Sequence, residues 1–136
     1  MSRIVALDGG TVRIGVAVSD PMYLTAQPYG VLEATAADLD ERLRELAQET
    51  DAERFVVGLP VGLDGREGAA AGHARELAAR VEAATGLPVD LHDERFSTVT
   101  AERVLVSANL RRSRRKQVRD RVAAAVFLQS YLDGRR

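Results

Sequence analysis

The apolar and polar positions near the start of the chain alternate as they do in β-strands. An apolar run at residues 5–7 is followed by Asp8-Gly9-Gly10, and apolar residues then alternate with small or polar ones over 14–18. Asp-Gly after an apolar run is typical of a β-hairpin, so this stretch predicts two antiparallel strands, with Asp8 as the last residue of the first strand before a tight turn. The segment 23–34, broken by a proline and a glycine, is either irregular or a third strand.

In the rest of the chain, segments with a helical pattern alternate with segments with a strand pattern. Apolar residues at helical spacing predict helices over about 37–49, 68–84, 97–110 and 114–132. Short apolar runs bounded by glycine, proline or polar residues predict buried strands over 54–60 and 89–96. This order predicts an α/β fold with a mixed sheet, in which the first strands are antiparallel and the later ones parallel, reached through right-handed helical crossovers.

Acidic residues follow the strand runs at the positions where such a sheet binds ligands. Ligands of open α/β sheets lie at the carboxyl ends of the parallel strands. Asp8 ends the first predicted strand, and Asp93 and Glu94 lie near the end of the last. Successive residues of a strand face opposite sides of the sheet, so only one of Asp93 and Glu94 can share a face with Asp8. The periodicity leaves the choice between them open, and Asp8 alone could equally be a turn residue.

Asp120 is unusual because it lies at the start of a strongly apolar helix. Residues 120, 124, 127 and 131 form one stripe of that helix, and from Val122 onward the helix is apolar on nearly all sides. A carboxylate entering a core costs several kcal/mol, roughly, unless it is paired or binds a metal. The alternative to a metal ligand is a salt bridge to a neighbouring arginine such as Arg119 or Arg121.

Size and composition limit the possibilities. The chain has 136 residues, 46% of them hydrophobic and 29% charged, and we expect one domain spanning 1–136. It has no apolar run long enough for a membrane helix and no export signal near the start, so the expected location is the cytoplasm, without a membrane partner. Because the chain has no cysteine, a metal site must use carboxylates or the two histidines.

The charge is balanced overall but unevenly distributed. The net charge is −1, acids dominate residues 33–53, and the segment RRSRRKQVRDR at 111–121 carries seven basic residues and one acid. Three converging carboxylates are typical of a Mg²⁺ site, and two such ions can clamp the attacking and leaving oxygens of a phosphoryl displacement. The basic segment would neutralise phosphates. Acids for metal beside bases for phosphate predict a nuclease.

Four stretches carry a resemblance to a known family. "LDGGTVRIGVAVSD", "VVGLPVGLDGREG", "DERFSTVTAERVL" and "RRKQVRDRVAAAVFLQSYLDG" resemble, in order and spacing, the motifs of the bacterial YqgF/RuvX family of pre-16S rRNA nuclease and Holliday junction resolvase-like proteins. The match covers most of the chain. The resemblance implies an RNase H-like fold, with a five-stranded mixed sheet flanked by helices on both sides.

The resemblance also implies metal-dependent hydrolysis of phosphodiester bonds in structured nucleic acid, with two Mg²⁺ or Mn²⁺ ions. It assigns the catalytic and metal-binding acids to Asp8, Glu94 and Asp120, with Asp93 as the alternative to Glu94. Contacts to nucleic acid fall to the following glycines and basic residues: Gly9, Gly10, Arg13, Arg111, Arg112, Arg114, Arg115 and Lys116. Arg13 could instead be an ordinary exposed strand arginine. His92 could lie near the site.

The chain departs from the family pattern at three positions. Gly9 stands where an apolar residue is usual, Val12 where a basic residue is usual, and Gly62 where asparagine is usual. None of these changes removes a predicted metal ligand. They bear on substrate preference, because each lies in a loop expected to touch nucleic acid.

Two other functions compete with the nuclease. A non-catalytic RNA- or DNA-binding factor for ribosome assembly would need only the basic segment. An actin-like ATPase also carries Asp-Gly-Gly-Thr at a hairpin, but such proteins close two domains over the nucleotide and this chain has length for one. Within the nuclease function, precursor 16S rRNA and the four-way DNA junction of recombination remain, and symmetric junction cutting would require a homodimer.

Overall fold

The computed structural model describes residues 2–10, 12–60, 68–93 and 112–134, and for 112–121 the backbone alone. Eight helices and strands follow one another in these ranges. They are β1 (Arg3–Gly9), β2 (Arg13–Ser19), β3 (Ala26–Glu33), α1 (Leu39–Thr50), β4 (Ala52–Leu59), α2 (Ala69–Thr85), β5 (Val89–Asp93) and α4 (Arg112–Gly134). The predicted helix over 97–110 and the end of the predicted strand over 89–96 lie outside the described residues.

The strands form one mixed sheet, as the sequence predicts. Its order is β3-β2-β1-β4-β5, with β1 central. β2 is antiparallel to β1 and to β3, whereas β4 is parallel to β1 and to β5. The uncertain segment 23–34 therefore contains a genuine strand, which lies at the edge of the sheet.

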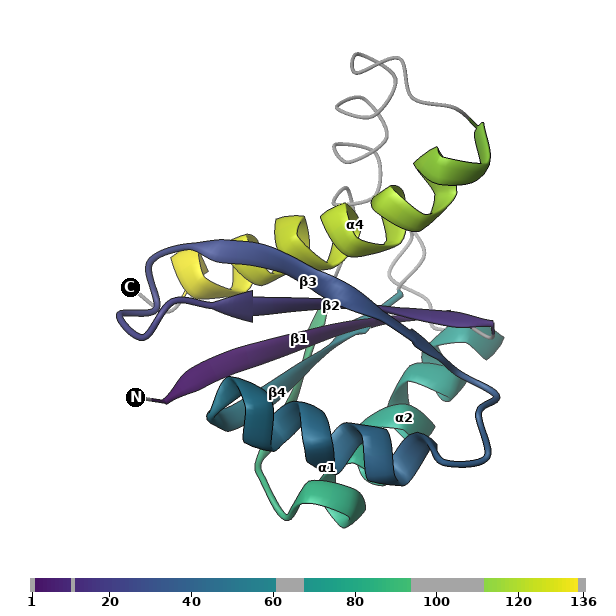
Figure 1. Cartoon of the computed structure of the whole chain (residues 1–136), viewed down its shortest axis with the longest axis horizontal. Helices are drawn as coiled ribbons and strands as arrows, with labels where there is room; N and C mark the ends of the chain where they lie inside the picture. Colours follow the sequence, from purple (N-terminus) through teal and green to yellow (C-terminus); the bar gives the residue numbers. More distant parts are fainter. Residues whose placement is uncertain (1, 11, 61–67, 94–111, 135–136) are drawn as a thin grey trace.

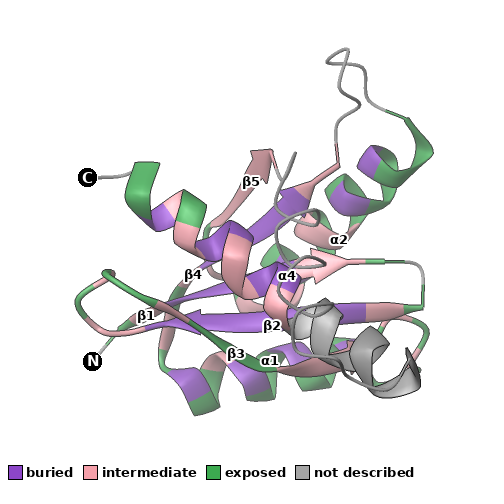
Figure 2. Ribbon diagram, turned by 90° about the horizontal axis from the view of Figure 1, so that it is seen from above, coloured by how far each residue is buried: buried purple, intermediate pink, exposed green. Residues whose placement is uncertain are grey.

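Helices cover both faces of the sheet. α1 and α2 lie on one face and α4 crosses the other (Figure 1). Each face has its own core, and β1 contributes to both. Val5 and Leu7 pack with α1 and α2, whereas Ile4 and Ala6 pack with Phe127 and Leu128 of α4. The most buried segments are the central strands β1, β2 and β4 (Figure 2).

The first strand runs one residue past the end that the sequence predicts. β1 continues through Gly9, which pairs with Ile14, and Asp8 pairs with Gly15. The hairpin closes where the Gly10 amide donates to the Arg13 carbonyl at 2.9 Å. The strand therefore ends one residue later than Asp8, where the sequence predicts its end, because Gly9 still pairs with Ile14 of β2. Asp8 belongs to the strand.

Candidate functional site

Asp8 faces the layer that contains α4. Ile4 and Ala6 of β1 pack against α4, and strand residues two apart share a face, so Asp8 lies on the α4 side near the carboxyl end of β1. Its side chain is half-buried. The Asp8 carboxylate therefore lies at the edge of the sheet where open α/β sheets bind ligands.

Glycines flank Asp8 on both neighbouring strands. Gly15 of β2 is its direct partner. On β4, Val57 pairs with Leu7, which brings the next residue, Gly58, alongside Asp8. Neither glycine adds a side chain to the α4 face beside Asp8. Sequence periodicity does not identify this pair, because the only signal for it is a glycine inside each of two apolar runs.

β5 separates the two acids that sequence periodicity could not rank. Val89 and Leu91 pack into the core on the α1 and α2 side. Alternation therefore puts Asp93 on that side as well, opposite to Asp8, and leaves His92 on the α4 side. Glu94 lies outside the described residues.

His92 packs between the sheet and α4. Its ring stacks on Phe127, with centroids 6.4 Å apart, and meets Tyr131 edge-on at 5.5 Å. Nε2 lies 3.4 Å from Ser130 Oγ. Burial lowers the pKa of His92, and the nearby Asp93 carboxylate acts in the opposite direction. Because Gly58 is its partner on β4, His92 is two strands from Asp8 on the same face, about 10 Å away.

Position 120 belongs to α4, which packs on the face of the sheet where Asp8 lies. Position 120 lies one turn before Ala124, and Ala124 and Phe127 are fully buried against the sheet. The predicted stripe of 120, 124, 127 and 131 therefore includes residues of the sheet-facing side of α4. The Asp120 side chain lies outside the description, as do those of Arg112, Arg114, Arg115 and Lys116; Arg111 is not described at all.

A hydrogen bond joins the C-terminal half of α4 to the sheet, and an ion pair within the sheet holds the carboxylate that accepts it. Asp90 Oδ2 on β5 accepts from Arg54 Nη1 at 2.7 Å and from the Tyr131 hydroxyl. The Asp90 carboxylate raises the pKa of Arg54. These contacts fix α4 against the sheet three turns after position 120.

The other predicted contacts to nucleic acid lie around the hairpin. Arg13 is half-buried, two residues before Gly15 on β2, and therefore on the same face as Asp8. Gly9 belongs to the opposite face, where a Cβ atom on it would lie 2.9 Å from Leu77 Cδ2. Gly10 is exposed at the hairpin end. Of the predicted contacts to nucleic acid, Arg13 thus lies on the α4 face of the sheet and Gly9 on the opposite face.

Two negative observations apply to the described residues only. Among them, no three His, Asp or Glu side chains gather closely enough to hold a metal ion. None of the helices in the described ranges is long and apolar enough to cross a membrane. Asp8 is the one predicted ligand on the α4 face whose side chain is described.

Comparison with solved structures defines the class of fold. The chain superimposes on "T. thermophilus RuvC in complex with Holliday junction substrate" with a TM-score of 0.60, over 99% of this chain and 96% of that one, at 18% identity. A second Thermus thermophilus RuvC structure gives 0.56 over 98% and 95%. With its sheet order and its helices on both faces, the chain has the RNase H-like fold predicted above.

Sequence comparison identifies the family within that class. The model of the family RuvX, described as Holliday junction resolvase, matches residues 2–134. A protein of Syntrophomonas wolfei is 46% identical over 97% of this chain and 94% of its own length. One of Moorella thermoacetica is 48% identical over 96% and 94%. Both bear the name "Putative pre-16S rRNA nuclease". The chain belongs to the RuvX family.

Proposed function

We propose that this protein is a nuclease that hydrolyses phosphodiester bonds in structured nucleic acid with divalent metal ions. The observation that carries the proposal is the position of Asp8. It lies at the carboxyl end of β1 between two glycines, on the face that α4 covers. The family and the RuvC-like fold support the same function.

Glu94 and Asp120 complete the proposed carboxylate set. Asp93 lies on the α1 and α2 side of β5, opposite to Asp8, and Glu94 is the acid that the resemblance to the family assigns. Position 120 precedes the buried Ala124 by one turn of α4. The face that Asp93 takes favours Glu94 over Asp93 as the third ligand.

The residues available suit hard divalent cations. Carboxylate oxygens are preferred ligands of Mg²⁺ and Mn²⁺, and a set of three acids can serve two ions. When bound, such ions stabilise charge on the attacking and leaving oxygens of a phosphoryl displacement. Asp8 would contribute one fixed carboxylate, and the flanking glycines would let the phosphate reach it.

The basic side chains would hold the rest of the substrate. Arg13 shares the face of Asp8, and the first turns of α4 contain Arg112, Arg114, Arg115 and Lys116. Cations at these positions would neutralise phosphates on either side of the cleaved bond. Because they would read the backbone and not the bases, we expect shape, more than sequence, to select the substrate.

Two substrates fit this site. The names of the relatives favour 5′-end processing of precursor 16S rRNA, a step of ribosome biogenesis, and the family description favours the four-way junction of DNA recombination. Both imply a cytoplasmic enzyme. Symmetric junction cutting would also require a homodimer with two sites related by a two-fold axis. We favour the rRNA, because relatives matched over nearly the whole chain carry that name.

The deciding experiment is a cleavage assay. Wild type and Asp8→Asn are incubated with Mg²⁺, with Mn²⁺ or with EDTA, on a labelled precursor rRNA fragment and a labelled four-way junction. We expect wild type to cut only with metal and Asp8→Asn not to cut. Paired nicks in the junction alone would indicate a resolvase, and cleavage in EDTA would contradict the metal mechanism.

The same samples test the competing functions. Folded wild-type protein that binds both substrates and cuts neither would be a non-catalytic assembly factor. ATP-dependent thermal stabilisation, without nucleic-acid binding, would indicate the actin-like ATPase.

A further inference from the structure

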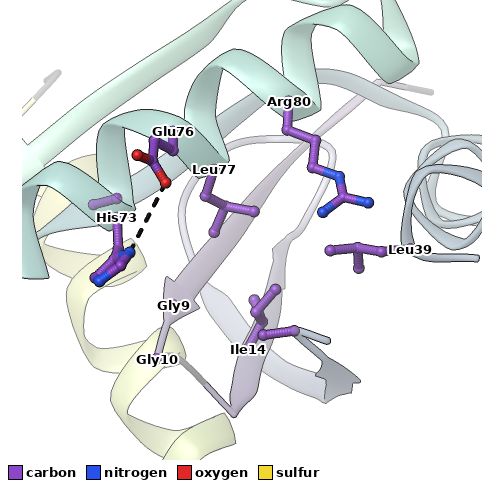
Figure 3. A pocket seen from close by; sticks show the side chains of 10 residues that line it. Gly9, Gly10, Ile14, Leu39, His73, Glu76, Leu77 and Arg80 are labelled. Atoms are coloured by element: carbon purple, nitrogen blue, oxygen red, sulfur yellow. Dashed lines mark ion pairs between the residues drawn. The ribbon is translucent and has the colours of Figure 1, made fainter. Parts of the chain in front are cut away.

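A cavity lies on the opposite face of the sheet from the Asp8 carboxylate. It occupies about 360 Å³ between the end of β1, α1 and α2. Ile14, Leu39, Ala74 and Leu77 form its apolar wall (Figure 3). This volume is at the lower end of the range for ligand pockets, roughly 300–1,000 Å³, and suits one aromatic heterocycle better than a dinucleotide.

Three polar side chains of α2 line the same cavity. His73 Nδ1 lies 3.9 Å from Glu76 Oε2 along one side. Arg80 reaches in from the other side, and its guanidinium points toward Leu39 (Figure 3). The rim therefore combines an imidazole, a carboxylate acceptor and guanidinium donors around an apolar floor.

The charge of the rim disfavours a bare anion. Arg80 Nε already contacts Asp40 Oδ1 at 2.6 Å, so its positive charge is compensated. Glu76 adds a negative charge at the solvent-exposed rim. A neutral heterocycle with both donor and acceptor groups fits these surroundings better than a phosphate does. Bases taken out of a stack are held in this way, against imidazole or guanidinium planes and by hydrogen bonds to their edges.

The cavity and the proposed metal site share one strand end. Gly9 and Gly10 line the cavity, and they are the two residues after Asp8. One residue of β1 therefore faces the metal site and the next faces the cavity. Because neither glycine has a side chain, a sugar–phosphate backbone crossing Gly10 can join a phosphate on one face to a base on the other.

We propose that this cavity receives a single unpaired nucleobase next to the phosphate that lies at Asp8. The inference rests on the proposed nuclease function and refines its substrate. The substrate would be a nucleic acid with an unstacked nucleotide at the cleaved position, as in a bulge, a loop or the end of a stem. A fully paired duplex would leave the cavity empty and bind through its phosphates alone.

The test compares three RNA duplexes of one sequence, by fluorescence anisotropy in EDTA. One carries a single unpaired adenosine at its centre, the second carries an abasic site there, and the third is fully paired. Stacking and edge contacts to one base predict about tenfold tighter binding of the first than of the second. Equal affinity for the two would overturn the inference.

Variants show whether this preference arises in the cavity. Ala74→Leu fills the cavity, and Arg80→Met removes its donors from a half-exposed position that folding should tolerate. For each variant, we expect the affinities for the duplex with the unpaired adenosine and for the abasic duplex to differ by no more than about twofold. The matched controls are Ala70→Leu, exposed on α2, and Arg44→Met, exposed on α1. Both controls should retain the wild-type preference for the unpaired adenosine over the abasic site. The inference would be overturned if Arg80→Met and a folded Ala74→Leu retained that preference too.

The outcomes separate this inference from the function on which it rests. Wild type that binds none of the three duplexes would contradict the proposed function itself. Wild type that binds all three equally would contradict the base site alone. Inorganic phosphate could also abolish the preference for the unpaired adenosine while duplex binding stays intact. That result would show that the cavity takes an anion, and it would overturn the inference.

Discussion

Tyr131 of α4 donates its hydroxyl hydrogen to Oδ2 of Asp90 on β5, although the two residues are 41 positions apart in the chain. The same carboxylate oxygen accepts from Arg54 of β4. One acid therefore ties two strands and the last helix together. Position 120 lies 11 residues before Tyr131 on α4, or about 16 Å along the helix axis. The contact fixes the helix from which Asp120, the proposed metal ligand, would act.

Tyr131→Phe should lower the free energy of unfolding by about 1 kcal/mol, since a part-buried charged acceptor loses a donor. Urea denaturation measures the change. The matched control is Tyr29→Phe, whose exposed hydroxyl lies 3.5 Å from Glu49 and should matter by less than about 0.5 kcal/mol. Equal effects of the two substitutions would contradict an anchoring role for the Asp90 contact.

Asp8→Asn and Asp93→Asn should differ sharply in cleavage, because the two carboxylates lie on opposite faces of the sheet. Loss of a metal ligand removes several kcal/mol, roughly, of charge stabilisation, so Asp8→Asn should slow cleavage about a hundredfold or more. Asp93→Asn should retain most of the wild-type rate. Single-turnover rates on rRNA and junction substrates provide the measurement. If Asp93→Asn were as slow as Asp8→Asn, Asp93 would replace Glu94 as the ligand.

Replacing Arg114, Arg115 and Lys116 together by serine should weaken binding to any nucleic acid and flatten its salt dependence. Each lost phosphate contact lowers the slope of log affinity against log salt by about 0.9, so the triple variant should lose close to three, roughly. Binding titrations at several salt concentrations measure the slope. Arg42→Ser with Arg44→Ser on α1 is the control, and an equal loss of slope there would mean that the basic segment has no special role.

The loop between β2 and β3 should loosen in acid. Oδ1 of Asp20 accepts from the Thr25 amide at 2.9 Å and the Leu24 amide at 2.7 Å, and these hydrogen bonds lower the pKa of Asp20. A carboxyl whose pKa falls on folding stabilises the protein above its unfolded pKa and loses that contribution as pH falls through the folded value. Acid unfolding of Asp20→Asn should therefore show a shallower dependence on pH. An Asp20 carboxyl that titrates by NMR at or above its ordinary pKa would contradict this account.

The order of helices and strands is the part of this protein that its sequence determined. Helical spacing located α1, α2 and α4, and glycine- and proline-bounded apolar runs located β4 and β5, because local periodicity reports which side of an element is buried. The same patterns indicated that Asp8 lies at the end of the first strand, and they carried the family resemblance. They ended that strand one residue early, since Gly9 still pairs with Ile14 of β2.

The tertiary structure decided which groups meet. Alternation along β5 separates Asp93 from its neighbours, but only the packing of Val89 and Leu91 against α1 and α2 shows which side Asp93 takes. The glycines beside Asp8 come from strands that precede and follow it, and the cavity behind Gly9 needs α1 and α2 in place. These relationships depend on strand register and on which helix covers which face. Contacts distant in sequence set both, and a local pattern carries no information about them.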